Sequence, residues 1–200
     1  MKPKDYTNHS GGAKGADMKW DEIGRRYGVI DHVHWKPKDL EELPKETYAQ
    51  MLKDVQSAGK VLKRPHMGFR GVELVHRNWL QVRYADAIYA IAHIVSSGEI
   101  DYRGFENKSG KEIVAGGTGW AVEMAIQKGK PVYVFDMSRN SWYMWNYAFR
   151  NFCALKEPPT LIKDFAGIGS RLLTPQGIQA IEDVYIKTFN NVKETIHAPS

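Results

Sequence analysis

The chain has 200 residues, of which 42% are hydrophobic and 26% are charged, and its formal net charge is +5. This composition excludes a disordered chain, and the length suits a single domain that buries its own core. Cys153 is the only cysteine, which excludes an intrachain disulfide and a multi-cysteine metal site. The start of the chain lacks the apolar run of a signal peptide, and the longest apolar run, residues 87–95, is too short to cross a membrane. We therefore expect a cytoplasmic protein with no membrane partner.

Strand-like and helix-like segments alternate along the chain, which predicts an α/β fold. We expect strands at 5–9 (polar), 29–35, 85–95, 113–115, 132–135 and 165–168. We expect helices at 13–27, 44–58, 72–84 and 118–129, and a last helix that starts at Thr174-Pro175. A basic loop at 60–71, a polar loop at 96–110 and an aromatic stretch at 142–149 lie between these elements.

Three of these segments also indicate where they lie in the fold. The near-continuous apolar character of residues 85–95 indicates a central strand covered on both faces. The polar residues 5–9 indicate an edge strand or a truncated one, and the polar loop 96–110 indicates a mobile loop near a site, or a lid. Together the elements predict a Rossmann-like parallel sheet flanked by helices in one domain.

The first glycine-rich loop reads SGGAKGAD, at the junction between a strand and a helix. Gly11 and Gly12 let the backbone approach a phosphate, and the N–H groups of the helix start favour an anion. Ser10 adds a hydroxyl, Lys14 adds a positive charge, and Asp17 completes the expected binding set. The spacing does not match a Walker A loop or the dinucleotide fingerprint. The alternative interpretation is a flexible turn ahead of a helix.

The second loop reads AGGTGWAVE and again leads into a helix. Gly116, Gly117 and Gly119 are expected to admit a phosphate, and Thr118 to cap the helix, to bind the phosphate, or both. Glu123 lies in the first helical turns, where the helix dipole favours a carboxylate. It is either a helix-start charge or a chemical group that holds a ribose hydroxyl or acts as an acid or base.

A third loop carries Gly169, Ser170 and Arg171, and a helix carries Arg77 and Asn78. A guanidinium binds phosphate through two parallel hydrogen bonds, so both arginines are candidate ligand residues. The alternative is that these side chains are merely solvated. Ligands of open α/β sheets bind beyond the carboxyl ends of the strands, and three glycine loops at such ends predict a phosphate site there.

The segments SGGAKGAD, RNWLQVRYADAIYAI, GGTGWAVEMAIQKGKPVYVFD and FAGIGSRLLTPQGIQAI resemble the SLOG superfamily, which groups Rossmann-like proteins related to the LOG phosphoribohydrolases and to the DprA/Smf proteins. The resemblance is closest to small, often phage-encoded members, and it implies binding of nucleotides or nucleotide-derived ligands. Residues 116–119 resemble the phosphate loop of the family, and Glu123 stands where LOG-like enzymes carry a helix glutamate. The fuller signature PGGxGTxxE is not present, because Trp120 stands where a small residue is expected.

We therefore expect a protein that binds a phosphate-bearing nucleotide or nucleotide derivative, with no cofactor and no metal. The resemblance to phage proteins sharpens this to sequestration of a nucleotide immune signal in the host cytoplasm. Two alternatives stay open: an N-glycosidase that acts on a nucleoside monophosphate through Glu123, and a DprA-like nucleic-acid binder. The scattered basic residues make nucleic acid the less expected partner. A homo-oligomer is the expected assembly.

Overall fold

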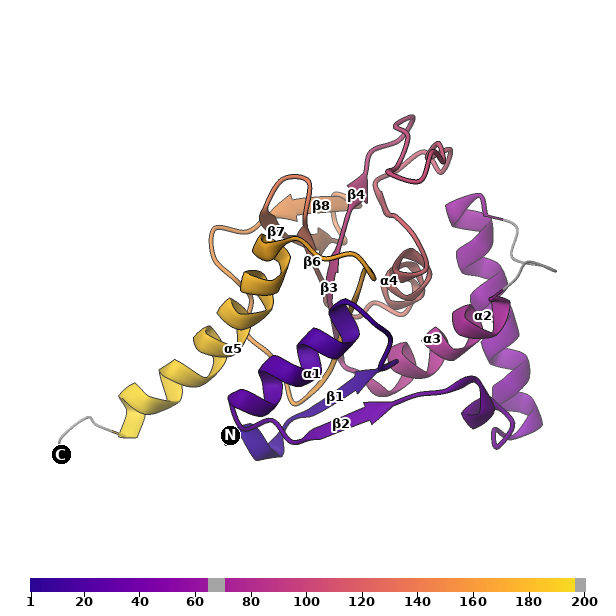
Figure 1. Ribbon diagram of the computed structural model, residues 1–200. Coiled ribbons are helices and arrows are strands. Elements are labelled where there is room, and N and C mark those ends of the chain that lie inside the picture. Colours follow the sequence, from indigo (N-terminus) through magenta and orange to yellow (C-terminus); the bar gives the residue numbers. More distant parts are fainter. Residues whose placement is uncertain (65–70, 197–200) are drawn as a thin grey trace.

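The computed structural model describes residues 1–64 and 71–196 (Figure 1). Within them, seven strands form one sheet in the order β2-β1-β9-β3-β6-β7-β8. The first five strands in this order are parallel, and β7 and β8 extend the sheet in antiparallel orientation. Helices α1 and α5 cover one face, and α2, α3 and α4 cover the other. The protein therefore has an α/β fold with a Rossmann-like sheet, which confirms the predicted fold class.

The strands of this sheet are β1 (Thr7–Ser10), β2 (Asp31–His34), β3 (Ala87–Ala92), β6 (Val132–Asp136), β7 (Ser141–Asn146), β8 (Asn151–Ala154) and β9 (Asp164–Gly169). The helices that cover it are α1 (Ala16–Arg26), α2 (Lys45–Leu62), α3 (Val72–Tyr84), α4 (Thr118–Gln127) and α5 (Pro175–Ile196). Two short strands, β4 (Ile94–Val95) and β5 (Ile113–Val114), pair with each other outside this sheet. None of the helices in the described ranges is long and apolar enough to cross a membrane.

Strand β3 lies inside the sheet, and all of its residues are buried. Ile88 and Ala90 pack into the core beneath α2, α3 and α4, whereas Tyr89 and Ile91 pack into the core beneath α1 and α5. Successive side chains of a strand point to opposite faces, so a doubly covered strand needs apolar residues at every position. The expected central strand is confirmed, but it ends at Ala92, before the chain turns away into β4.

Strand β1 is polar and short, but it lies between β2 and β9 and is therefore not an edge strand, as one interpretation of its sequence held. The side chain of Asn8 is fully buried, donates to Asp21 Oδ1 at 3.0 Å and accepts the N–H of Gly167 at 2.9 Å. The next residue, His9, lies with Nε2 3.0 Å from Oδ1 of Asp164. Buried polar groups are stable where they are hydrogen-bonded. The polarity of this strand therefore reflects internal pairing rather than contact with solvent.

Strands β7 and β8 form an antiparallel hairpin that the sequence pattern did not predict. In β7 the buried residues are Trp142 and Trp145, which are three positions apart and belong to the cores on opposite faces of the sheet. A strand with one covered face shows buried residues at every second position. The spacing in β7 departs from that pattern because each face of this part of the sheet is covered at a different point.

Helix α2 continues to Leu62, beyond the end expected at Gly59. A Cβ atom on Gly59 would lie 2.9 Å from the Trp120 ring, so this glycine permits close packing of α2 on α4 rather than ending the helix. The helix ends instead with Lys63 in the left-handed region, at φ 55°. Half of the basic loop expected at 60–71, namely residues 65–70, lies outside the described residues.

The two helix starts predicted from threonines have different outcomes. Thr174 Oγ1 accepts the N–H of Gly177 at 3.0 Å, which is the N-cap geometry expected ahead of α5. At α4 the cap position is occupied by Gly117, and Thr118 is the first helical residue, so the expectation that Thr118 caps this helix is wrong.

Candidate functional site

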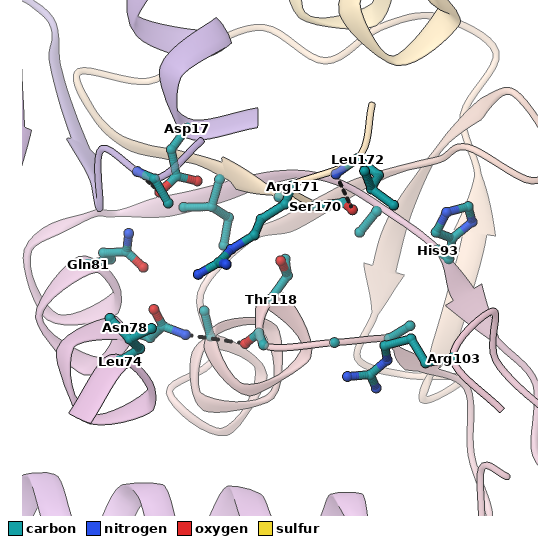
Figure 2. A pocket seen from close by; sticks show the side chains of 18 of the residues that line it. Asp17, Leu74, Asn78, Gln81, His93, Arg103, Thr118, Ser170, Arg171 and Leu172 are labelled. Carbon is teal, nitrogen blue, oxygen red and sulfur yellow. Dashed lines mark hydrogen bonds between the residues drawn. The ribbon is translucent and has the colours of Figure 1, made fainter. Parts of the chain in front are cut away.

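A cleft of about 460 Å³ opens at the carboxyl ends of β3 and β9, which is where open parallel sheets place their ligands (Figure 2). Its walls come from the start of α4, the loop after β9, one face of α3, and the segment that carries β4 and β5. Of the binding residues expected from the sequence, the following line it: Asp17, Arg77, Asn78, Gly116, Gly117, Thr118, Gly169, Ser170 and Arg171. The structure therefore brings the second loop, the third loop and the α3 motif to one place.

The start of α4 presents a row of unpaired backbone donors to this cleft. The N–H groups of Gly116, Gly117 and Thr118 make no hydrogen bond with any described residue. Gly116 has a φ of +75°, a left-handed conformation that glycine adopts without strain. Unpaired N–H groups at a helix N-terminus, together with the helix dipole, form an anion site.

Other residues hold this row in place. Arg64, which is not part of the cleft lining, donates from Nη1 to the carbonyl oxygen of Gly116 at 2.9 Å and from Nη2 to that of Val114 at 3.2 Å. Asn78 of α3 donates from Nδ2 to the carbonyl oxygen of Gly117 at 3.2 Å (Figure 2). The C=O and N–H of a trans peptide bond point in opposite directions. Because the carbonyl oxygens of Gly116 and Gly117 bond to Arg64 and Asn78, the N–H groups of the same peptide bonds point away from these two side chains. Arg64 was not among the residues expected from the sequence.

The loop after β9 contributes Ser170 and Arg171 to the cleft lining. The N–H of Ser170 continues the sheet by donating to the carbonyl oxygen of Ile91 at 2.8 Å, and its Oγ accepts the N–H of Leu172 at 3.2 Å. The side chain of Arg171 is exposed and makes no hydrogen bond or ion pair with any residue that the structure describes. This guanidinium is therefore available to a ligand.

The first glycine loop is closed on itself, contrary to the expectation that it binds the anion directly. Oδ2 of Asp17 accepts the N–H groups of Gly11 at 3.1 Å and Ala13 at 3.4 Å, and Oγ of Ser10 accepts that of Gly12 at 3.1 Å. The N–H groups of Gly11, Gly12 and Ala13 are thus satisfied by the loop itself. Of the residues expected here, Ser10, Gly11, Gly12 and Lys14 do not line the cleft, and only Asp17 does.

Asp17 and Arg77 form the buried end of the cleft, each with 6% of its surface exposed. Burial raises the pKa of Asp17 to about 6, although Arg77 and the two loop N–H groups act in the opposite direction. Burial also lowers the pKa of Arg77, although the charge of Asp17 acts in the opposite direction. Nε of Arg77 is buried without a hydrogen-bond partner among the described residues.

Gln81 links this end of the cleft to α3. In the amide orientation that satisfies both of its polar atoms, its oxygen accepts from the N–H of Gly11 at 2.7 Å and from Nη1 of Arg77 at 3.2 Å, and its nitrogen donates to Oδ1 of Asn78 at 3.2 Å. Figure 2 shows Asp17, Gln81 and Asn78 along one side of the cleft. This side is rich in hydrogen-bonding groups and carries one carboxylate.

The opposite side of the cleft holds residues that sequence reasoning missed: His93, Tyr102 and Arg103 (Figure 2 labels the first and last). His93 stands at the break between β3 and β4, where its Nδ1 and Oγ of Ser138 are 2.8 Å apart. Tyr102 and Arg103 belong to the polar segment 96–110, and these two residues place that segment beside the cleft. The sequence signal was weak because the segment has no motif; only its location between two glycine loops pointed to it.

Gly119 and Glu123 lie outside the cleft. A Cβ atom on Gly119 would lie 2.0 Å from the carbonyl oxygen of Val114, so this glycine serves close backbone packing. Glu123 lines a second cavity, where its Oε2 accepts from Nζ of Lys111 at 2.6 Å and its Oε1 from Nε2 of Gln127 at 3.1 Å. The expectation that Glu123 faces the ligand held by residues 116–119 is therefore wrong.

Two histidines of β2 share one carboxylate partner. His32 and His34 both pair with the carboxylate of Asp21, with His32 Nδ1 at 3.0 Å from Oδ1. Within residues 1–64 and 71–196, no group of three or more His, Cys, Asp or Glu side chains is placed to hold a metal ion.

The charges of the cleft favour an anion. The guanidinium groups of Arg77, Arg103 and Arg171 line it together with the N-terminus of α4, and Asp17 is the carboxylate among the lining residues. Arg103 shares its charge with Asp101, to which Nη2 donates at 2.9 Å, whereas Arg171 has no such partner in the described chain. The arrangement can bind a ligand with an anionic group near α4 and hydrogen-bonding groups that reach towards Asp17 and Gln81. Comparisons of the chain with protein-family models, with curated proteins and with solved structures gave no match.

Proposed function

We propose that the protein binds a phosphate-bearing nucleotide, or a small molecule derived from one, in the cleft between α3, α4 and the loop after β9. The observation that carries this proposal is the row of three unpaired N–H groups at Gly116, Gly117 and Thr118, which faces the same cleft as the unpaired guanidinium of Arg171. A phosphate accepts hydrogen bonds from such a row and from arginine at the same time.

Two further features favour a nucleotide over a simple anion. The cleft volume, about 460 Å³, lies within the range of about 300–1,000 Å³ that small-molecule sites occupy. The side formed by Asp17, Gln81 and Asn78 offers acceptors and donors that a bare phosphate does not need but that a sugar or base can use. If the protein binds and releases its ligand without a chemical reaction, its role would be to sequester a nucleotide immune signal.

A second candidate function is hydrolysis of an N-glycosidic bond, and the observation that favours it is Asp17. Its carboxyl group lines the cleft and its pKa of about 6 lies in the range that general acids and bases use near neutral pH. In this form of the proposal Asp17 takes the role that sequence reasoning gave to Glu123, because Glu123 lies in a different cavity.

The first experiment is mass spectrometry of the small molecules released from the purified, heat-denatured protein. It is followed by calorimetric titration of the native protein with inorganic phosphate, ribose 5-phosphate and the ribonucleoside 5′-monophosphates. A binding protein returns each nucleotide intact, whereas a hydrolase returns free base and ribose 5-phosphate. If neither phosphate nor any nucleotide binds at millimolar concentration, the proposed function is wrong.

The matched variants for this titration are Arg171→Ala and Lys14→Ala. Both side chains are exposed, but only Arg171 lines the cleft. Removing a charged hydrogen bond of about 1.5–3 kcal/mol lowers affinity by about 10- to 150-fold, so we expect Arg171→Ala to weaken nucleotide binding by that factor and Lys14→Ala to leave it unchanged. Titration with an oligonucleotide at two salt concentrations tests the nucleic-acid alternative, since binding to a phosphate backbone falls steeply with salt.

A further inference from the structure

The segment between β4 and β5, residues 96–112, forms an arm that projects beyond the body of the protein, next to the cleft (Figure 1). The antiparallel pairing of β4 with β5 forms the base of this arm, and a bridge between Ile100 and Glu106 closes it further out. The arm is therefore a hairpin-like extension of the chain rather than part of the core.

Two buried polar side chains brace the arm from inside. Oδ1 of Asp101 accepts the N–H groups of Arg103 at 2.8 Å and Phe105 at 3.1 Å. Nδ2 of Asn107 donates to the carbonyl oxygens of Val95 and Lys111, both at 2.8 Å. Because these bonds fix the backbone on both sides of the arm, its outer side chains are held in defined positions without packing against the core.

Tyr102 lies on this arm, and its aromatic side chain is exposed within the cleft. Its surface is 55% exposed, although it lines the cleft, and its hydroxyl makes no hydrogen bond with any described residue. The hydroxyl lies 3.6 Å from the position that a Cβ atom on Gly116 would take, so the ring stands at the end of the N–H row. An aromatic face that is exposed next to an anion site is accessible to the base of a ligand held there.

His93 adds a second ring to the same wall. Its centroid lies 5.0 Å from that of Tyr102, with an angle of 48° between the planes. The contact between its Nδ1 and Ser138 fixes the imidazole, and the guanidinium carbon of Arg103 lies 5.8 Å from the Tyr102 centroid. Two rings and a guanidinium thus line one side of the cleft.

We propose that Tyr102, supported by His93, is the stacking platform for the planar base of the bound nucleotide, and that it sets the preference of the site for a ligand with an aromatic ring over a sugar phosphate. This inference rests on the proposed function, because the phosphate at the start of α4 is what brings the base to the arm. Stacking on an aromatic side chain accepts any base, since every base has a π-face. The platform therefore gives affinity for bases as a class, and the hydrogen-bonding side of the cleft is left to distinguish among them.

The test compares nucleotides with ribose 5-phosphate, which has the same phosphate and sugar but no base. In the wild-type protein at least one ribonucleoside 5′-monophosphate should bind more tightly than ribose 5-phosphate. Tyr102→Ala should weaken binding of that nucleotide by about 5- to 150-fold, the range measured for losing one base–aromatic stack, and should leave the affinity for ribose 5-phosphate and inorganic phosphate unchanged. Tyr102→Phe should bind like the wild type, because it keeps the ring.

Ile100→Ala is the matched control. Ile100 lies on the same arm and is 69% exposed, but it does not line the cleft, so its loss should change neither affinity. The inference is overturned if Tyr102→Ala weakens nucleotide and ribose 5-phosphate equally, or if the wild type binds the two equally. If the wild type binds neither ligand nor phosphate, it is the proposed function that fails. Thermal melts check that the variants fold, as is expected because both side chains are exposed.

Discussion

A Cβ atom on Gly11 would lie 1.2 Å from Nη1 of Arg77, so the guanidinium of Arg77 occupies the space that any other residue at position 11 would fill. The glycine loop and the cleft are thereby coupled without the loop touching a ligand. The clash falls on the end of a flexible side chain, so the protein can relieve it by moving Arg77. The requirement for glycine comes from this packing and not from a phosphate on the loop.

We predict that Gly11→Ala weakens nucleotide binding by about tenfold or more, because a displaced Arg77 loses a charged hydrogen bond to the ligand. The melting temperature should change little. Calorimetric titration beside a thermal melt checks both. Unchanged affinity in the folded variant would mean that Arg77 does not contribute to the site.

Gly117 offers a way to remove one donor of the row. Its φ of −62° is the value that proline adopts, and a Cβ atom at this position has no neighbour within 4 Å. Gly117→Pro should therefore fold normally, since the lost N–H has no partner in the described chain. Phosphate and nucleotide affinity should fall by about 10-fold or more, the worth of one charge-assisted hydrogen bond.

Gly117→Ala is the control for this prediction, because it fills the same space as the proline Cβ but keeps the N–H. It should bind like the wild type. Equal losses in the alanine and proline variants would show that bulk, and not the donor, is what matters.

At neutral pH the wild-type protein, with Asp17, should be less stable than the Asp17→Asn variant. The pKa of this carboxyl group is about 6 in the folded protein against an ordinary value of 3.8, so the folded state binds more protons between these two values. The free energy of unfolding therefore falls as the pH rises through this window, by about 3 kcal/mol in total. Asp17→Asn keeps an oxygen for the N–H groups of Gly11 and Ala13 but never ionises.

We predict that Asp17→Asn raises the free energy of unfolding by up to about 3 kcal/mol at pH 7.5, and that the difference from the wild type shrinks to near zero below pH 4. Urea unfolding at these two pH values measures it. The same variant should abolish product formation if the protein is a hydrolase. A pH-independent difference would contradict the assignment of the raised pKa to Asp17.

Glu123 is expected to act on stability alone. Its side chain is 4% exposed, and that of its partner Lys111 is 18% exposed. Breaking a buried pair by removing one charge costs about 3–5 kcal/mol, and the partial exposure of Lys111 puts Glu123→Gln at the low end of this range or below it. Nucleotide affinity should not change, because this residue does not line the cleft.

A double-mutant cycle with Lys111→Met separates the pair from the individual residues. The two substitutions together should destabilise the protein by less than the sum of their separate effects. Loss of nucleotide binding in a folded Glu123→Gln variant would contradict this prediction and would show that Glu123 contributes to the binding site.

Local patterns predicted the helices and the parallel strands, because periodicity reports which face of an element is buried. They did not predict the partner of each side chain. Glu123 follows Thr118 by five positions, which places it about 140° away from Thr118 around an α-helix. Ala121 follows Thr118 by three positions and lines the cleft on the same side of the helix. Helical spacing alone argued against Glu123 facing the loop. Nothing in the sequence indicated that the carboxylate of Asp17 accepts the donors of its own loop.

Strand β9 is the strand that joins two halves of the sheet: β2 and β1 lie on one side of it, and β3, β6, β7 and β8 on the other. Every strand except β9 is made before residue 164 leaves the ribosome, so the two halves have no backbone pairing to each other until late in synthesis. The bond from Gly167 to Asn8 spans 159 positions, and contacts of such separation close slowly. Because Gly169 ends this same strand and Ser170 and Arg171 follow it directly, the cleft is assembled in the step that unites the two halves of the sheet, late in synthesis.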